Sequence, residues 1–181
     1  MKPGIRDLHR FVRGNFKRQL LTRYKKLMIL TEADLQAYAF ELLRKFFRLR
    51  DPMKKRFRVL NKPYFREINM YPDIAVFKRG RPWVLFELKE RSNLSPRIAG
   101  EEREGLLIAR QKLDPPPRRG YLLYVARAGK KRALKGPKGE AARYFFEVPI
   151  VLPHSWPKAR KKAWERDRKK WTKYVSRAPS T

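Results

Sequence analysis

The sequence predicts an α/β fold in which one mixed domain is flanked by basic helical extensions. Apolar residues recur at helical spacing in two segments, and apolar runs typical of covered strands lie between and after them. Lys and Arg are dense at both ends of the chain. We therefore expect three parts: a basic helical arm at 1–30, an α/β domain at 31–152, and a basic helix or tail at 153–181.

The charge of the chain is strongly positive. Its 181 residues include 47 Lys and Arg against 17 Asp and Glu, which gives a net charge of +30. Self-repulsion of this size destabilises a compact protein unless a polyanion is nearby. The charge therefore predicts nucleic acid as the partner of this protein. Ribosomal proteins and proteins that bind anionic membranes have a similar charge.

Two absences in the sequence exclude whole classes of site. There is no cysteine, which excludes disulfides, Cys-ligated zinc, iron–sulfur clusters and thiol nucleophiles. No apolar run reaches the roughly 18 residues that a transmembrane helix needs. We expect a soluble cytoplasmic protein that makes no membrane contact and associates with the nucleoid through DNA.

The first segment, residues 1–30, has apolar residues at near-helical spacing among many Lys and Arg. Two compatible interpretations stay open: a helix packed on the domain with a solvated basic face, or an arm that contacts DNA.

A cleaner helix is predicted from Thr31 to about Arg50, with Thr31 as its N-cap and Pro52 stopping it. Glu32 lies on the apolar stripe of this helix, whereas Glu41 lies on the polar side. Glu32 is therefore the carboxylate expected to face inward, although partnership with the helix dipole explains it equally simply.

Three strands should follow. Residues 57–70 read as extended, with a first strand near 64–70 that carries Glu67. Segments 73–77 and 83–89 form the second and third strands, apolar on both faces and therefore covered on both sides.

The second and third strands predict a cluster of charged side chains. A hairpin symmetric about Gly80 places Asp73 across from Glu87, and Lys89 points to the same face as Glu87. Buried charges are costly unless they are paired or bound to metal, so the cluster indicates a chemical role. We expect the helix of Glu32 to cover this face.

The remaining segments complete the α/β pattern. A helix is predicted at 97–113, a buried strand at 121–126, a mobile basic loop at 127–143, and a strand at 144–152 that Pro149 moves to a sheet edge. A basic helix at 158–173 carries tryptophans that favour docking on the domain, with stacking on nucleotides as the alternative.

This order of helix, three strands, helix and strand, with Pro72-Asp73 on the second strand and Glu87-Leu88-Lys89 on the third, resembles the PD-(D/E)xK nuclease superfamily and its restriction-endonuclease-like fold. Glu32 matches the acid that many branches carry on the first helix. The resemblance covers about residues 31–127, and the basic ends lie outside it.

The resemblance implies hydrolysis of DNA phosphodiester bonds with Mg²⁺ or Mn²⁺ as cofactor. Asp73, Glu87 and the backbone carbonyl of Leu88 would hold the metal, Lys89 would lie beside the phosphate, and Glu32 would help to position metal or water. Glu67, Arg97 and the acids at 101–104 are weaker candidates. An alternative is that Asp73, Glu87 and Lys89 form a structural ion pair in an inactive domain.

The function predicted by the resemblance and the charge is a metal-dependent DNA endonuclease acting on branched or duplex DNA, similar to a Holliday-junction resolvase and acting as a homodimer. A restriction-type, nicking or exonucleolytic DNase of the same fold is an alternative, and so is a non-catalytic nucleic-acid-binding or RNA-associated protein. The expected phosphate contacts come from the basic segments: Lys17, Arg18, Arg91, Lys130, Lys131, Arg132, Lys161, Lys162, Lys169 and Lys170.

Overall fold

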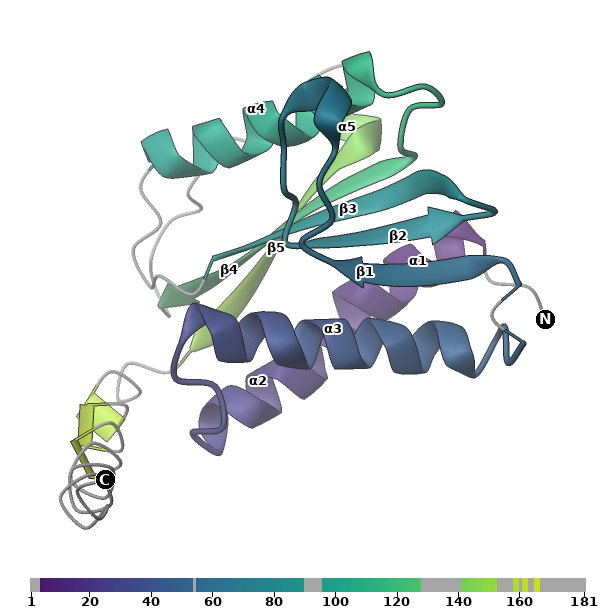
Figure 1. The fold of residues 1–181 in the computed structure, drawn as a ribbon. Coiled ribbons are helices and arrows are strands. Elements are labelled where there is room, and N and C mark those ends of the chain that lie inside the picture. The colour runs from purple at the N-terminus through teal and green to yellow at the C-terminus, as the bar shows by residue number, and fades with distance from the viewer. Residues whose placement is uncertain are drawn as a thin grey trace, which may run out of the picture.

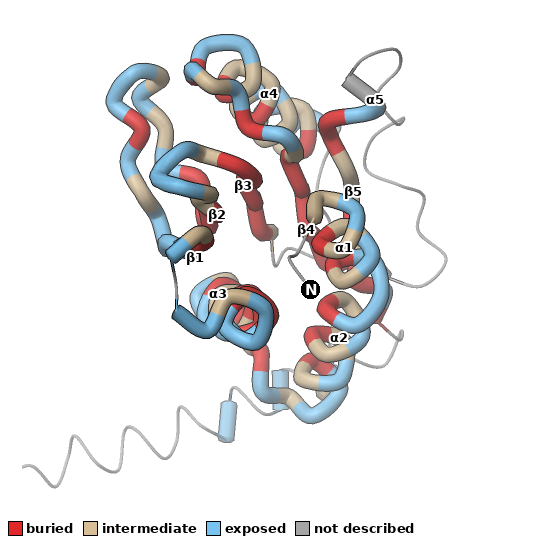
Figure 2. Tube along the Cα trace, turned by 90° about the vertical axis from the view of Figure 1, so that its right-hand side faces the viewer, coloured by how far each residue is buried: buried red, intermediate tan, exposed pale blue. Residues whose placement is uncertain are grey.

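The protein is a three-layer α/β structure in which helices cover both faces of one mixed sheet (Figures 1 and 2). The computed structural model describes residues 4–53, 55–89, 96–127 and 141–152, together with 158, 159, 161, 162, 165 and 166. The sheet has five strands in the order β1-β2-β3-β4-β5. The α/β class predicted from the sequence is confirmed.

The antiparallel half of the sheet contains β1 (Phe57–Asn61), β2 (Ile74–Lys78) and β3 (Arg81–Lys89). A two-residue turn joins β2 to β3, with positive φ angles at Arg79 (53°) and Gly80 (80°). A turn of this kind matches the twist of a hairpin and suits glycine at its second position. Ile74 pairs with Phe86, so Asp73 stands across from Glu87, as the sequence predicts.

The parallel half of the sheet contains β3, β4 (Arg119–Arg127) and β5 (Phe145–Leu152). Helix α4 (Pro96–Lys112) connects β3 to β4, as a parallel pair requires. Strand β5 carries Pro149 and lies at the sheet edge, which confirms the prediction.

Helix α3 (Glu32–Arg48) forms where its caps and periodicity predict it. The side chains of Thr31 and Asp34 make a reciprocal capping box at its start. Its buried apolar residues lie on one stripe and share a hydrophobic cluster with the α3-side residues of β2 and β3, which are Ile74, Val76, Val84, Phe86 and Leu88.

The N-terminal segment is part of the same core. It forms α1 (Ile5–Phe11), a π-helical stretch (Val12–Phe16) and α2 (Lys17–Lys25), which lie on the α3 side of the sheet. Five of its side chains are fully buried in that cluster: Leu8, Val12, Phe16, Leu20 and Tyr24. Residues 5–25 are therefore packed on the domain, as the first of the two compatible interpretations predicts.

Helix α4 covers the opposite face of the sheet. Its Ala99, Leu106, Ala109 and Leu113 side chains are buried in a second cluster with residues of the three central strands, which are Ala75, Leu85, Leu122 and Tyr124. The expectation of a sheet covered on both faces is thus confirmed.

The predicted first strand near 64–70 is wrong. The strand is β1, and residues 62–73 fold into a loop that contains a 3₁₀ turn (Arg66–Ile68) and an isolated bridge between Phe65 and Met70. Asn69 is left-handed (φ 49°), which reverses the chain where the prediction has an extended one. Glu67 is exposed in this loop.

Most of the predicted basic loop at 127–143 and most of the predicted C-terminal helix lie outside the described residues. Among the residues that are described there, Ala141–Tyr144 is a short helix, α5, and the six described positions between 158 and 166 are helical. No helix among the described residues has the length and apolar character needed to cross a membrane.

The burial of the N-terminal helices predicts a large cost for truncating Phe16. Phe16→Ala should lower the free energy of unfolding by about 3–5 kcal/mol, because it opens a cavity between α2 and the sheet. Arg18→Ala, at an exposed position two residues on, should change it by less than about 0.5 kcal/mol. Urea denaturation of both variants tests this, and equal stabilities would contradict it.

Candidate active site

Two carboxyl groups are buried side by side at one end of the β2–β3 hairpin. Asp73 is 8% exposed and Glu87 is 5% exposed. Glu87 lies two residues from Leu85 along β3, so its side chain points to the α4 face. The two side chains share a hydrogen bond.

The environment favours the protonated form of these two carboxyl groups. Burial raises the pKa of Asp73, against the lowering effect of the Leu88 amide and the Lys89 ammonium. Burial and the negative charges of Asp73 and Glu102 raise the pKa of Glu87 to about 10. Two carboxylates this close cannot both ionise readily without a cation between them.

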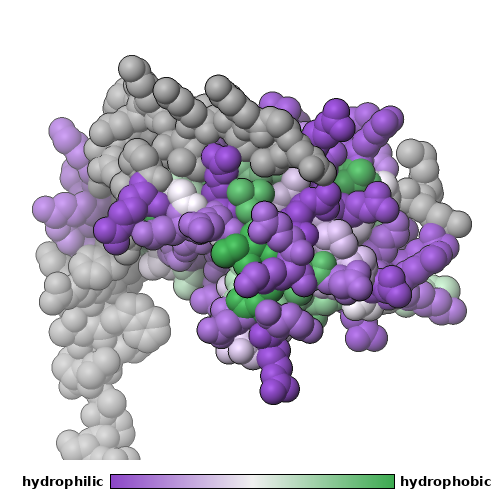
Figure 3. Space-filling model, turned by 90° about the horizontal axis from the view of Figure 1, so that it is seen from above, coloured by the Kyte–Doolittle hydropathy of each residue, from purple (hydrophilic) through white to green (hydrophobic). Residues whose placement is uncertain are grey.

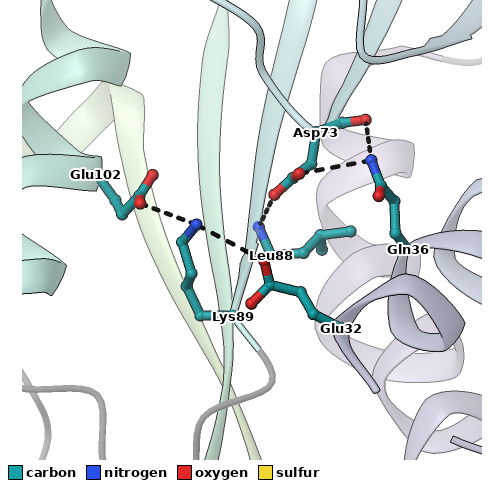
Figure 4. Close-up of polar contacts among 6 residues, drawn as sticks. All are labelled: Glu32, Gln36, Asp73, Leu88, Lys89 and Glu102. Atoms are coloured by element: carbon teal, nitrogen blue, oxygen red, sulfur yellow. Dashed lines mark hydrogen bonds and ion pairs between the residues drawn. The ribbon is translucent and has the colours of Figure 1, made fainter.

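The Leu88 backbone supports Asp73 directly. Its amide donates a 2.8 Å hydrogen bond to Asp73 Oδ2 (Figure 4). Along a strand, the N–H and C=O of one residue project to the same edge, so the Leu88 carbonyl also faces the β2 side. Leu88 lies beyond the last ladder pair of the hairpin, Ile74 with Phe86, so the ladder does not use this carbonyl on that side.

Lys89 ends β3 and is held by acids from both layers of helices. Its Nζ lies 2.9 Å from Glu102 Oε1 on α4 and 4.0 Å from Glu32 Oε1 on α3 (Figure 4). Burial acts to lower the pKa of Lys89, but the hydrogen bond and charge of Glu102, with the charges of Glu32 and Asp73, raise it overall. Lys89 is therefore a charged group fixed beside the carboxyl pair.

Gln36 positions Asp73 from the α3 side. Its Nε2 donates to the Asp73 backbone oxygen at 3.1 Å and to Asn61 Oδ1 at 2.9 Å, with a longer 3.4 Å contact to Asp73 Oδ1. Gln36 is 8% exposed. The sequence patterns assign no role to Gln36. Its place one helical turn after Glu32, on the apolar stripe, nevertheless indicates a side chain that faces inward.

The face that carries Glu87 and Lys89 is covered by α4, which corrects the expectation that the helix of Glu32 covers it. Glu32 instead reaches the site from the first turn of α3 at the end of the sheet, half-exposed, while Glu41 is exposed as predicted. The acids at 101–104, which the sequence offers as weaker candidates, include Glu102, the ion-pair partner of Lys89. Its position between Ile98 and Leu106, four residues from each, marks it as inward-facing.

The donor set fits a hard divalent cation. Among the residues that the structure describes, no group of three or more His, Asp and Glu side chains is arranged to hold a metal. Mg²⁺, however, usually takes only one or two carboxylates and completes its shell with carbonyl oxygens and water. Asp73, Glu87 and the Leu88 carbonyl supply such a set.

The predicted phosphate contacts are only partly described. Lys17 and Arg18 begin α2 on the α3 side of the sheet, with Arg18 exposed. Lys161 and Lys162 are exposed, and Lys161 lies 3.9 Å from Glu165. The other candidates lie outside the described residues: Arg91, Lys130, Lys131, Arg132, Lys169 and Lys170. Seen from the α4 side, the described surface is mostly hydrophilic (Figure 3).

A cleft of about 390 Å³ lies at the other end of the hairpin, not at the carboxyl pair. Its lining includes Lys78, Arg81, Trp83 and Arg118. Glu87 is four residues along β3 from Trp83, which is about 13 Å of strand.

Comparisons with protein-family models, with curated proteins and with solved structures give no match to this chain.

The raised pKa of Glu87 predicts a pH-dependent gain in stability for Glu87→Gln. The folded wild type holds a proton that the unfolded chain releases, so its stability falls as pH rises from about 4.5 towards about 10. Glutamine carries no such proton. In chelator, Glu87→Gln should melt a few degrees above wild type at pH 9 and close to it at pH 4.5.

Thermal denaturation across this pH range measures the effect. Glu41→Gln, at an exposed position on α3, is the matched control and should show no such divergence. A difference between Glu87→Gln and wild type that stays constant from pH 4.5 to 9 would contradict the prediction.

Proposed function

We propose that the protein is a Mg²⁺-dependent DNA endonuclease with a restriction-endonuclease-like fold. The observation that carries the proposal is the buried Asp73–Glu87 pair with Lys89 fixed beside it at the end of the hairpin. The element order supports it, since α3, β1–β3, α4 and β4 follow one another as the resemblance requires. The charge of +30 supports a polyanionic substrate.

Each residue of the site has a role in this reaction. Asp73, Glu87 and the Leu88 carbonyl would hold the cation, while Gln36 and the Leu88 amide fix the orientation of Asp73. A divalent cation bound there would polarise the scissile phosphate and lower the pKa of a bound water.

Lys89 would stabilise the negative charge that develops on the phosphate. Glu102 orients its ammonium from α4 and keeps it protonated, while Glu32 stands on the other side at the entrance of the site.

The substrate is DNA recognised by shape, because broad contacts with phosphates carry no base sequence. A branched substrate cut by a symmetric dimer is the preferred form of the proposal. Restriction-type, nicking and exonucleolytic cleavage are the alternatives with the same chemistry.

Cleavage assays on supercoiled plasmid and on a four-way junction test the proposal. Cutting should require Mg²⁺ or Mn²⁺ and stop in chelator. Asp73→Ala and Lys89→Ala should each reduce the cleavage rate by roughly 10²-fold or more, because each removes a group that acts on the reacting phosphate. DNA binding should persist in both variants.

Glu41→Ala and Lys45→Ala, at exposed positions on α3, serve as charge-matched controls and should cleave at the wild-type rate. Binding without cleavage on every substrate and with both metals would show that the cluster is a structural ion pair in a non-catalytic nucleic-acid-binding protein.

The salt dependence of DNA binding tests the basic face of α2. Lys17→Ala/Arg18→Ala should lower the slope of log K against log salt concentration by about 0.9 for each phosphate that the variant no longer neutralises. Lys45→Ala/Arg48→Ala on α3 is the matched exposed pair. An unchanged slope in the α2 variant would show that Lys17 and Arg18 do not contact DNA phosphates.

A further inference from the structure

Two tyrosines stack on each other at the surface of the loop between β1 and β2. The rings of Tyr64 and Tyr71 lie 4.6 Å apart between centroids, with an angle of 23° between their planes. Both are largely exposed, Tyr64 at 49% and Tyr71 at 60%. Tyrosine is enriched at interfaces because its ring is apolar and its hydroxyl is polar, so a preformed exposed stack of two tyrosines is suited to a flat ligand.

The loop that carries the stack is firmly held. Phe65 and Met70 exchange backbone hydrogen bonds of 2.9 and 3.3 Å, and the Tyr64 hydroxyl donates to Asn69 Oδ1 at 3.2 Å. The buried ring of Phe65 stacks on Phe77 of β2, with 5.8 Å between centroids. The stack is therefore positioned before any ligand arrives, which reduces the ordering cost of binding.

The loop also leads directly to the carboxyl pair. Tyr71 precedes Asp73 by two residues, a distance of at most about 7 Å along the chain. The Lys62 amide donates to the Asp73 carbonyl oxygen at 3.0 Å and closes the base of the loop. The backbone that carries Tyr71 is thus continuous with the backbone that carries Asp73, at the end of the hairpin where the carboxyl pair lies.

The charge around the stack suits a nucleic-acid strand. Lys62 and Arg66 are exposed in the same loop, against one exposed acid, Glu67. Aromatic rings in basic surroundings bind unpaired nucleotides by stacking, whereas the bases of a continuous duplex are already stacked on each other and not available.

We propose that Tyr64 and Tyr71 form a stacking platform for an unpaired DNA base next to the phosphate held at Asp73 and Glu87. The substrate class is then a DNA single strand, a frayed end or a branch with unpaired nucleotides, rather than continuous duplex. The position of the base relative to a cleaved bond rests on the proposed nuclease function, whereas binding of the base to the platform does not.

A binding assay in chelator tests the platform without any cleavage. Two labelled strands of about twelve nucleotides are compared, one of thymidines and one with abasic central positions that keep every phosphate. Stacking is worth about 1–3 kcal/mol per base, so wild type should bind the thymidine strand roughly 5- to 150-fold more tightly.

Tyr64→Ala/Tyr71→Ala should reduce this preference to about twofold or less and keep the salt dependence, because the cations that bind phosphate remain. Tyr64→Phe/Tyr71→Phe should retain the preference, since the ring faces remain. Tyr71→Ala alone keeps the partner residues of the Tyr64–Asn69 hydrogen bond, and it serves if the double variant fails to fold. Leu49→Ala/Met53→Ala removes exposed apolar side chains elsewhere and should bind as wild type.

The proposal is overturned if wild type binds both strands equally, or if the double alanine variant keeps the preference. These results are separable from the nuclease assay. Metal-dependent plasmid cleavage without a thymidine preference removes the platform alone, and a thymidine preference without cleavage on any substrate removes the nuclease function alone.

Discussion

The register of the β2–β3 hairpin is the constraint on which the rest of this structure depends. Because side chains alternate along a strand, a slip of one residue would move Glu87 and Lys89 from the α4 face to the α3 face and separate them from Asp73 and Glu102. The two-residue turn at Arg79-Gly80 sets one end of this register. An irregularity between Val76 and Phe77 then shifts the pairing of the two strands by one residue. With this shift, Asp73 lies across from Glu87.

The layers of the fold then meet at this end of the sheet. The middle layer supplies the buried carboxyl pair and Lys89, α3 supplies Gln36 and Glu32, and α4 supplies Glu102. Burial makes the ionised pair unfavourable, and Lys89, whose charge acts on both carboxyl groups, is already engaged by acids from both helices. Two buried carboxyl groups in this setting ionise together only if a cation binds between them, which is the link between this end of the sheet and the proposed divalent metal.

Much of this architecture is predictable from the sequence, because it depends on local periodicity and pairing. The span of α3, the choice of Glu32 over Glu41, the pairing of Asp73 with Glu87 and the edge position of β5 all follow from such patterns. The sequence patterns do not predict which helix covers which face, because that depends on the strand order of the whole sheet. The strand predicted near 64–70 fails for a different reason: strand-forming side chains there are overridden by the left-handed Asn69 and the packing of Phe65.

The packing of α2 against β5 also has a consequence for synthesis of the chain. These two elements are more than a hundred residues apart, and the core on the α3 side contains buried residues from both, such as Leu20 and Ile150. Since a ribosome adds about 5–20 residues each second, β5 is synthesised several seconds or more after the N-terminal helices that it covers. During that interval the apolar side of a basic amphipathic segment lacks the strand that covers it in the finished fold.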